Sequence, residues 1–159
     1  MIILGIDPGL ATTGYAVIAT THNKTRLVEC GAITSPAKTA MPARLAMIYQ
    51  DITAIIKKFK PRRAGVEELF FYKNQKTVMP VSQARGVILL ALNHNGIKVS
   101  EFTPLQVKQA VTGYGRANKQ QVQKMVKLLL CLSSIPRPDD AADALAVALC
   151  THQSRKLGL

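Results

Sequence analysis

The chain has 159 residues, of which 48% are hydrophobic, and its 21 lysines and arginines face only nine aspartates and glutamates, a formal net charge of +12. This length and composition predict one folded domain over residues 1–159 and exclude a wholly disordered chain. No apolar run is long enough to span a bilayer, and no basic segment precedes the apolar start, so we expect no membrane association and no secretory signal. The positive charge predicts a polyanionic partner, most commonly a nucleic acid.

The cysteines and histidines give no sign of a disulfide framework or a zinc site. Cys30, Cys131 and Cys150 are odd in number and lack the spacing of a paired motif. The three histidines also lack zinc-ligand spacing. We therefore expect a protein of the reducing cytoplasm.

The first nine residues carry the most informative pattern. A short apolar run, residues 2–6, leads directly into Asp7 and a Pro-Gly turn. Such a run predicts a strand that is buried on both faces, so that Asp7 lies at the edge of the sheet. A carboxylate on so rigid a support suits catalysis or metal binding. An aspartate that only caps its own turn is the alternative.

The next segments predict two antiparallel strands and a helix. Residues 13–19 and 27–33 are strand-like and closely spaced. A loop over residues 36–42 precedes an amphipathic helix that Pro61 ends. Its apolar stripe comprises Leu45, Ile48, Ile52, Ile55 and Phe59. Cations crowd its end, where the helix dipole alone could account for them: Lys57, Lys58, Lys60, Arg62 and Arg63.

A second strand that ends in carboxylates follows. Residues 64–66 are short and apolar and lead to Glu67 and Glu68. The next stretch predicts a loop in which Phe70 and Tyr72 could stack on bases, while Lys73 and Lys76 hold phosphates. Some of these aromatic side chains could instead close the core.

Residues 77–95 predict a helix that starts or kinks at Pro80. Its segment 87–92 is apolar almost all round, which indicates burial in the core or against a partner, and we expect a dimer contact there. Residues 97–102 alternate as a strand, and a strand after a helix after a strand predicts a parallel crossover.

The last third of the chain predicts helices around the same sheet. Thr103 and Pro104 open a short helix that runs to about Val111. Asn118 and Gln121 begin the next one with a capping-box pattern. One face of that helix comprises Val122, Met125, Val126, Leu129 and Leu130, and another carries Lys119, Gln123 and Lys127. The final helix starts near Asp139, and its inward residues are Ala142, Leu145, Ala146 and Leu149.

Acidic residues stand at three element ends, namely Asp7, Glu67 and the cluster of Asp139, Asp140 and Asp143. On a helix, Asp143 shares a face with Asp140 and also with Asp139, so spacing alone does not choose between them. Gathered carboxylates repel one another, and Mg²⁺ relieves that repulsion. An acidic centre in a basic protein is the electrostatic layout of a metal-dependent nuclease. Each acid taken alone could simply cap a turn or a helix.

Several stretches, in this order along the whole chain, resemble the RuvC family of bacterial Holliday-junction resolvases. They are IDPG at 6–9 with Gly14, VEELF at 66–70, SQARG at 82–86, QVKQ at 106–109 and DAADALA at 140–146. The resemblance implies an α/β, ribonuclease-H-like fold, a five-stranded mixed sheet with three antiparallel and then parallel strands, flanked by helices. It also implies a homodimer that nicks two strands of a four-way junction symmetrically, leaving 5′-phosphate and 3′-hydroxyl ends.

The resemblance assigns residues to roles. It implies that Asp7, Glu67, Asp140 and Asp143 are catalytic and bind two Mg²⁺ ions, with Mn²⁺ as a substitute, although some relatives carry a histidine at the position of Asp140. It implies that Phe70 stacks near the junction centre, that Lys108 and Lys119 support binding and catalysis, and that the helix of residues 83–92 forms the dimer contact. Together with Tyr72, Lys73, Lys76 and Arg85, these residues make up the expected DNA-contacting set. A branch-migration helicase complex of RuvA and RuvB is the implied partner.

Three other functions compete with junction cleavage. A non-catalytic junction-binding protein would use its acids only as caps. An actin-like ATPase would share the hairpin at residues 5–9 but would need a second such hairpin, which the chain lacks. Another nuclease on the same fold would act on RNA–DNA hybrids or on flaps.

Overall fold

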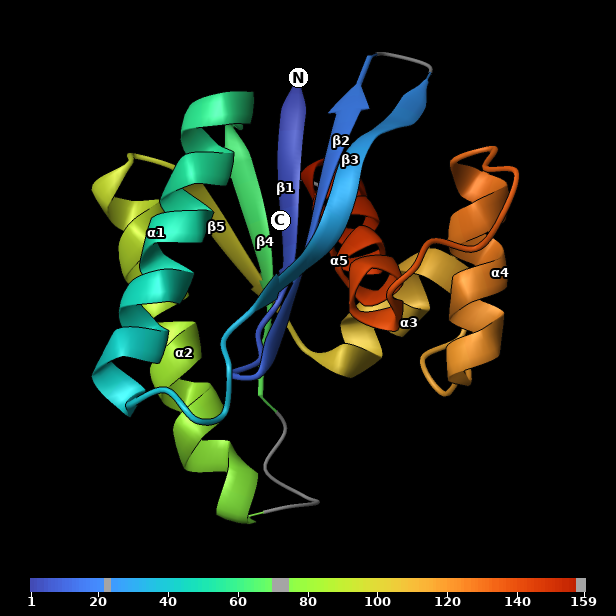
Figure 1. Ribbon diagram of the computed structural model, residues 1–159. Helices are drawn as coiled ribbons and strands as arrows, with labels where there is room; N and C mark the ends of the chain where they lie inside the picture. The colour runs from blue at the N-terminus through green and yellow to red at the C-terminus, as the bar shows by residue number, and fades with distance from the viewer. Residues whose placement is uncertain (22–23, 70–74, 157–159) are drawn as a thin grey trace.

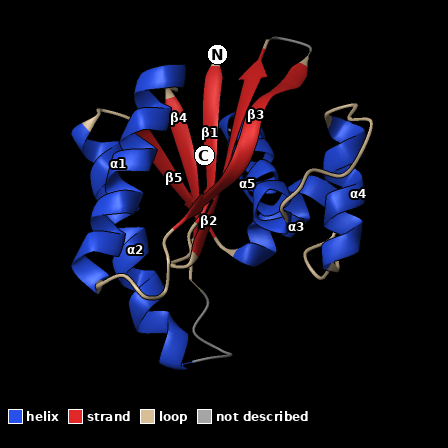
Figure 2. Cartoon of the chain, in the orientation of Figure 1, coloured by secondary structure: helices blue, strands red, loops and turns tan. Residues whose placement is uncertain are grey.

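A five-stranded mixed sheet forms the centre of the protein, and helices cover both of its faces (Figures 1 and 2). The computed structural model describes residues 1–21, 24–69 and 75–156. The strands are β1 (Ile2–Asp7), β2 (Thr12–Thr20), β3 (Thr25–Thr34), β4 (Arg63–Glu67) and β5 (Lys98–Phe102). They lie side by side in the order β3-β2-β1-β4-β5. The pairs among β1, β2 and β3 are antiparallel, whereas β4 and β5 run parallel to β1. This arrangement confirms the predicted ribonuclease-H-like sheet.

One face of the sheet is covered by α1 (Met41–Phe59) and α2 (Gln75–His94) (Figure 1). Helix α1 buries Ile48, Ile52 and Ile56 against this face. The helix starts earlier than predicted, because Pro42 lies in its first turn rather than in the preceding loop. Proline is tolerated there since the first helical N–H groups have no partner within the helix.

Helix α2 is buried on one side only, although the sequence is apolar almost all round. Ala84, Ile88 and Leu92 are fully buried against the sheet and α1. Leu90, by contrast, is 46% exposed. The helix begins at Gln75 and contains Pro80 in its interior. The core therefore covers one side of α2, and on the described part of the helix Met79 and Leu90 remain exposed within one chain.

The opposite face is covered by α5 (Asp139–Lys156), with α3 (Pro104–Thr112) and α4 (Lys119–Leu129) packed outside it (Figure 1). The predicted capping box of Asn118 with Gln121 is confirmed, and so is the predicted N-cap at Thr103. Thr103 also forms a capping box with Gln106, which was not predicted from the sequence. Within α4 the prediction for Leu129 is wrong. That residue is 40% exposed, because the helix ends there and the chain turns inward to bury Leu130 instead. Among the described helices, none combines the length and the apolar character required to traverse a bilayer.

Helix α5 lies unusually close to the sheet because small residues meet on both sides of the contact. A β-carbon on Gly5 of β1 would come within 2.2 Å of the Ala144 carbonyl oxygen, and one on Gly65 of β4 within 1.9 Å of the Thr151 hydroxyl. On β2, a β-carbon on Gly14 would come within 2.1 Å of the Asp140 carbonyl oxygen. The helix contributes the buried Ala144 and Ala148 to the contact with Gly5. The approach of α5 to the sheet thus requires glycine on three adjacent strands.

We expect Gly5→Ala to lower the free energy of unfolding by about 2–3 kcal/mol, because the new methyl group would press on the α5 backbone, which cannot move aside. Urea titration followed by circular dichroism measures the change. Gly115→Ala is the control, since a β-carbon there would meet only the side chains of Leu105 and Gln109. Equal destabilisation by the two substitutions would contradict the close-packing argument.

Candidate active site

Asp7 and Glu67 stand side by side where two parallel strands end. The register pairs Ile6 with Val66, so the next residues of β1 and β4 are Asp7 and Glu67. The turn after Asp7 is braced by a hydrogen bond from the Thr13 hydroxyl to the Gly9 carbonyl oxygen, 2.6 Å long. The Ser35 hydroxyl donates to the Leu10 carbonyl oxygen in the same region. Both carboxylates are therefore held by rigid backbone.

The first turns of α5 bring two further acids to the same place. Gly14 is the partner of Asp7 on the neighbouring strand, and the Asp140 main chain lies directly over Gly14. Asp143 follows one turn later on α5. The missing side chain at Gly14 is what lets the start of α5 reach the sheet edge. Residues from the two ends of the chain and from its middle thus meet at one point.

The electrostatics of the carboxylates agree with this convergence. Burial, and then the negative charges of Glu67, Asp143 and Asp140, raise the pKa of Asp7 to about 8. Burial and the charge of Asp143 raise the pKa of Glu67 to about 7, although a hydrogen bond from Asp7 and the charge of Lys108 act in the opposite direction. Burial also raises the pKa of Asp143. These acids form one interacting set that favours a proton or a cation among them.

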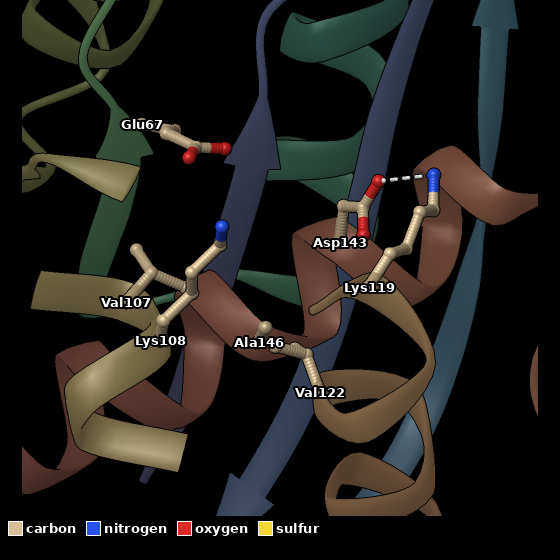
Figure 3. A pocket seen from close by; sticks show the side chains of 7 residues that line it. All are labelled: Glu67, Val107, Lys108, Lys119, Val122, Asp143 and Ala146. Atoms are coloured by element: carbon tan, nitrogen blue, oxygen red, sulfur yellow. Dashed lines mark ion pairs between the residues drawn. The ribbon is translucent and has the colours of Figure 1, made fainter. Parts of the chain in front are cut away.

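Two lysines face the acids across a cavity of about 240 Å³, drawn in Figure 3. Lys119, at the start of α4, forms ion pairs with Asp143 at 3.0 Å and with Asp139 at 3.5 Å. Partial burial of Lys119 lowers its pKa, but the interactions with these two aspartates outweigh burial and raise it. Lys108 of α3 points into the cavity toward Glu67 (Figure 3). The remaining lining residues are Val107, Val122 and Ala146.

Arg85 supports Glu67 from the other side of the sheet. Its Nε atom on α2 donates to the main-chain carbonyl oxygen of Glu67 at 3.3 Å. Its Nη2 atom is paired with the Glu101 carboxylate on β5. Arg85 therefore ties α2 to the end of β4 and β5. We predicted it as a DNA contact, and these internal bonds, which sequence reasoning missed, give it a structural task.

The structure brings together most of the predicted site residues. Asp7, Glu67, Asp140 and Asp143 converge, and Lys108 and Lys119 line the adjoining cavity. Asp139, left open by spacing, pairs with Lys119 and Arg137 at the rim. Phe70, Tyr72 and Lys73 lie outside the described residues, and Lys76 lies in the first turn of α2 with its side chain not described.

The donor set suits a hard divalent cation, although the carboxylates are not arranged as a finished site. Within the described residues, no three histidine, cysteine, aspartate or glutamate side chains have the geometry to hold one metal ion as they stand. Asp143 is instead directed to Lys119 (Figure 3). Mg²⁺ is commonly held by one or two carboxylates together with water and substrate phosphate. The hydrogen-bonded pair of Asp7 and Glu67 fits that requirement.

We expect Asp7→Asn to stabilise the metal-free protein increasingly as the pH rises. The raised pKa means that the native state binds more protons than the unfolded chain between about pH 4 and pH 8, so Asp7 reduces stability across this window as the pH increases. From pH 5 to pH 8 the difference in unfolding free energy between variant and wild type should grow by about 2–4 kcal/mol. Urea titrations in chelator measure it. Asp51→Asn, at an exposed position of α1, is the control. A difference in unfolding free energy that does not change with pH would contradict the raised pKa of Asp7.

Comparison with known proteins agrees with this geometry. The family model described as crossover junction endodeoxyribonuclease RuvC matches residues 3–152. The chain is 55% identical to the RuvC of Halothermothrix orenii, with 99% of this chain and 95% of the relative covered. It is 54% identical to the RuvC of Clostridioides difficile, with 99% and 93% covered.

A solved structure agrees as well. Thermus thermophilus RuvC in complex with Holliday junction substrate superposes with a TM-score of 0.94 at 34% identity, with 99% of this chain and 96% of that chain covered. The match in sequence and in fold extends over the strands and helices that carry the acids. This chain belongs to the RuvC family of crossover junction endodeoxyribonucleases.

Proposed function

We propose that this protein resolves four-way DNA junctions in recombination and repair, by paired symmetric nicks that leave 5′-phosphate and 3′-hydroxyl ends. The observation that carries the proposal is the convergence of Asp7, Glu67 and Asp143 at one end of the sheet, beside a cavity lined by Lys108 and Lys119. Family membership supports it, as does the likeness to a RuvC solved with Holliday junction substrate. The enzyme is a metal-dependent nuclease and acts as one domain.

The four acids are the proposed catalytic residues and metal ligands. Asp7 and Glu67 form the centre, because β1 and β4 fix them side by side and their pKa values are raised by burial and by neighbouring carboxylates. Asp143 and Asp140 complete the set from α5. Two Mg²⁺ ions, for which Mn²⁺ substitutes, would supply activation of the attacking water and stabilisation of the leaving oxygen.

The lysines balance negative charge on either side of the reaction. Lys108 faces Glu67 but forms no ion pair with any carboxylate of the described residues. Its ammonium group is therefore positioned to attract the scissile phosphate. Lys119 is held by Asp143 and Asp139 and is therefore fixed beside the same cavity. A phosphate that enters the cavity meets both ammonium groups, which offset the charge that develops in the transition state.

The surface around the site supports binding of a branched polyanion. The formal net charge of +12 attracts DNA. We propose that Phe70 and Tyr72 stack on bases near the junction centre, that Lys73 and Lys76 hold phosphates, and that Arg85 adds to DNA binding by shaping the end of β4.

A homodimer would supply the second cut, because symmetric nicking of a junction needs two copies of the site. The uncovered side of α2, which includes Leu90 at 46% and Met79 at 71% exposed, supports a contact between two copies there. We further propose that the protein acts in the cytoplasm together with the RuvA and RuvB branch-migration complex.

We expect Asp7→Asn to abolish junction cleavage while junction binding survives. The substitution removes one negative charge from the proposed metal site and leaves the basic surface intact, so the rate should fall by at least about 10³-fold. Cleavage of a labelled mobile junction in Mg²⁺ and a gel-shift titration in chelator measure the two properties. Asp51→Asn should leave both unchanged. An Asp7→Asn protein that cleaves at the wild-type rate would contradict the assigned role.

The substrate class is tested by comparing three DNA structures. A mobile four-way junction, an RNA–DNA hybrid duplex and a flap, all of equal length, are incubated with the protein in Mg²⁺. We expect paired nicks in the junction only. Preferred cleavage of the hybrid or the flap would assign the site to another ribonuclease-H-like nuclease. Tight junction binding without cleavage at any protein concentration would indicate a non-catalytic junction-binding protein.

A further inference from the structure

A second pocket lies at the opposite end of the sheet from the acids. It occupies about 630 Å³ between the ends of α1 and α2 and the starts of β4 and β5. In Figure 1 this is the upper end of the sheet, where the N-terminus also lies. Arg63 and Glu67 mark the two ends of β4, which are about 13 Å apart at the usual rise of a strand. The pocket is therefore separated from the catalytic cavity by the length of the central strands.

The pocket combines a basic rim with an apolar floor. Lys57, Lys60 and Arg62 line it and are exposed. Ile56, which is 4% exposed, lies beneath them with the buried Pro61 and the half-buried Ile97. Asn95 and Gly96 of the turn after α2 complete the lining. No acidic residue takes part in this lining.

The three rim cations, Lys57, Lys60 and Arg62, form no ion pair among the described residues. Their neighbour Lys58 differs, because it pairs with Glu29 at 2.6 Å and lies over the Phe59 ring. The three rim cations thus take no part in the ion pair by which Lys58 links α1 to β3.

The helix dipole accounts for only part of the cluster. Of the three rim cations, only Lys57 lies in the last turn of α1, and Arg62 lies beyond its end. Lys60 occupies the C-cap with a φ of 48°, in the left-handed region. Glycine is usual at such a helix end, because a side chain there is strained. A lysine at this position retains a cation at a conformational cost.

We propose that this pocket docks an acidic peptide segment of a partner protein, with an apolar side chain of the segment on the floor and its carboxylates on the rim. Charge complementarity requires an anionic occupant. The apolar floor favours a peptide, because a peptide can bury an aliphatic side chain there, whereas a phosphate group has no apolar surface of its own. The lining also contains no aromatic ring on which a nucleobase could stack.

The position of the pocket allows a partner to bind without blocking the acids. Because the acids lie at the other end of the sheet, a partner in this pocket leaves the catalytic cavity open. The inference rests on the pocket alone and does not depend on the nuclease activity, so the two can fail separately. A partner protein bound in this pocket would recruit the protein to its own location without competing with the substrate.

The test measures peptide binding to the full chain by fluorescence anisotropy. The probe is a labelled synthetic peptide of four aspartates around a central leucine, and a second peptide carries serine in place of the leucine. We compare wild type with K57Q/K60Q/R62Q and with K24Q/R26Q/K38Q, which removes two exposed lysines and one exposed arginine elsewhere. Thermal melting establishes that both triple variants fold.

We expect K57Q/K60Q/R62Q to weaken binding of the leucine peptide at least about tenfold, since up to three ion pairs are lost. The matched control variant should stay within about twofold of wild type. The serine peptide should bind wild type about tenfold more weakly, because the floor then buries no apolar side chain. Junction DNA in chelator should leave leucine-peptide binding unchanged, and K57Q/K60Q/R62Q should cleave junctions at the wild-type rate.

Four results would overturn the proposal. Equal losses in the two triple variants would show attraction to net charge only. Equal binding of the two peptides would show that the floor is unused. Displacement of the peptide by junction DNA would place it on the catalytic face. If K57Q/K60Q/R62Q kept its peptide binding but bound junction DNA more weakly and with a smaller salt dependence, the rim would be assigned to DNA instead.

Discussion

The site depends on how closely α5 approaches the sheet. Gly5, Gly14 and Gly65 lie under this helix, and a β-carbon on each would collide with atoms of α5. With larger residues at these positions α5 would lie farther from the sheet, and Asp140 and Asp143 would move away from Asp7 and Glu67. The contact between glycines and alanines is therefore more than core packing, because it sets the distance between carboxylates that come from opposite ends of the chain.

Such a group of acids is stable only with compensation. Burial and mutual repulsion raise the pKa of Asp7 to about 8, which is the sign of negative charge gathered at a cost in free energy. Lys119 offsets part of that charge through Asp143, and Lys108 acts on Glu67 from across the cavity. The protein thus stores an unfavourable interaction that a divalent cation would relieve.

Local sequence patterns predicted the parts of this protein that short segments determine. The apolar strand before Asp7, the N-cap at Thr103, the capping box at Asn118 and the acids at element ends are all found as expected. Features that depend on contacts between distant segments were missed. The pairing of Lys119 with Asp143 needs the crossing of α4 and α5, and the exposure of Leu129 follows from the place where α4 ends. The single glycine in each of β1, β2 and β4, together with the frequent alanines of α5, was the available signal for the close packing.

Arg85 shows how assembly and catalysis can share one residue. It stands on α2, the helix whose uncovered side we propose as the dimer contact, and it bonds to the main chain of Glu67 and to Glu101. A shift of α2 would therefore act on the end of β4, where Glu67 is held. Since hydrogen bonds of an arginine to a carboxylate and a carbonyl group are directional, the position of α2 and the position of Glu67 are constrained together. A dimer formed through α2 would in this way stabilise the same backbone that positions Glu67, a proposed catalytic acid.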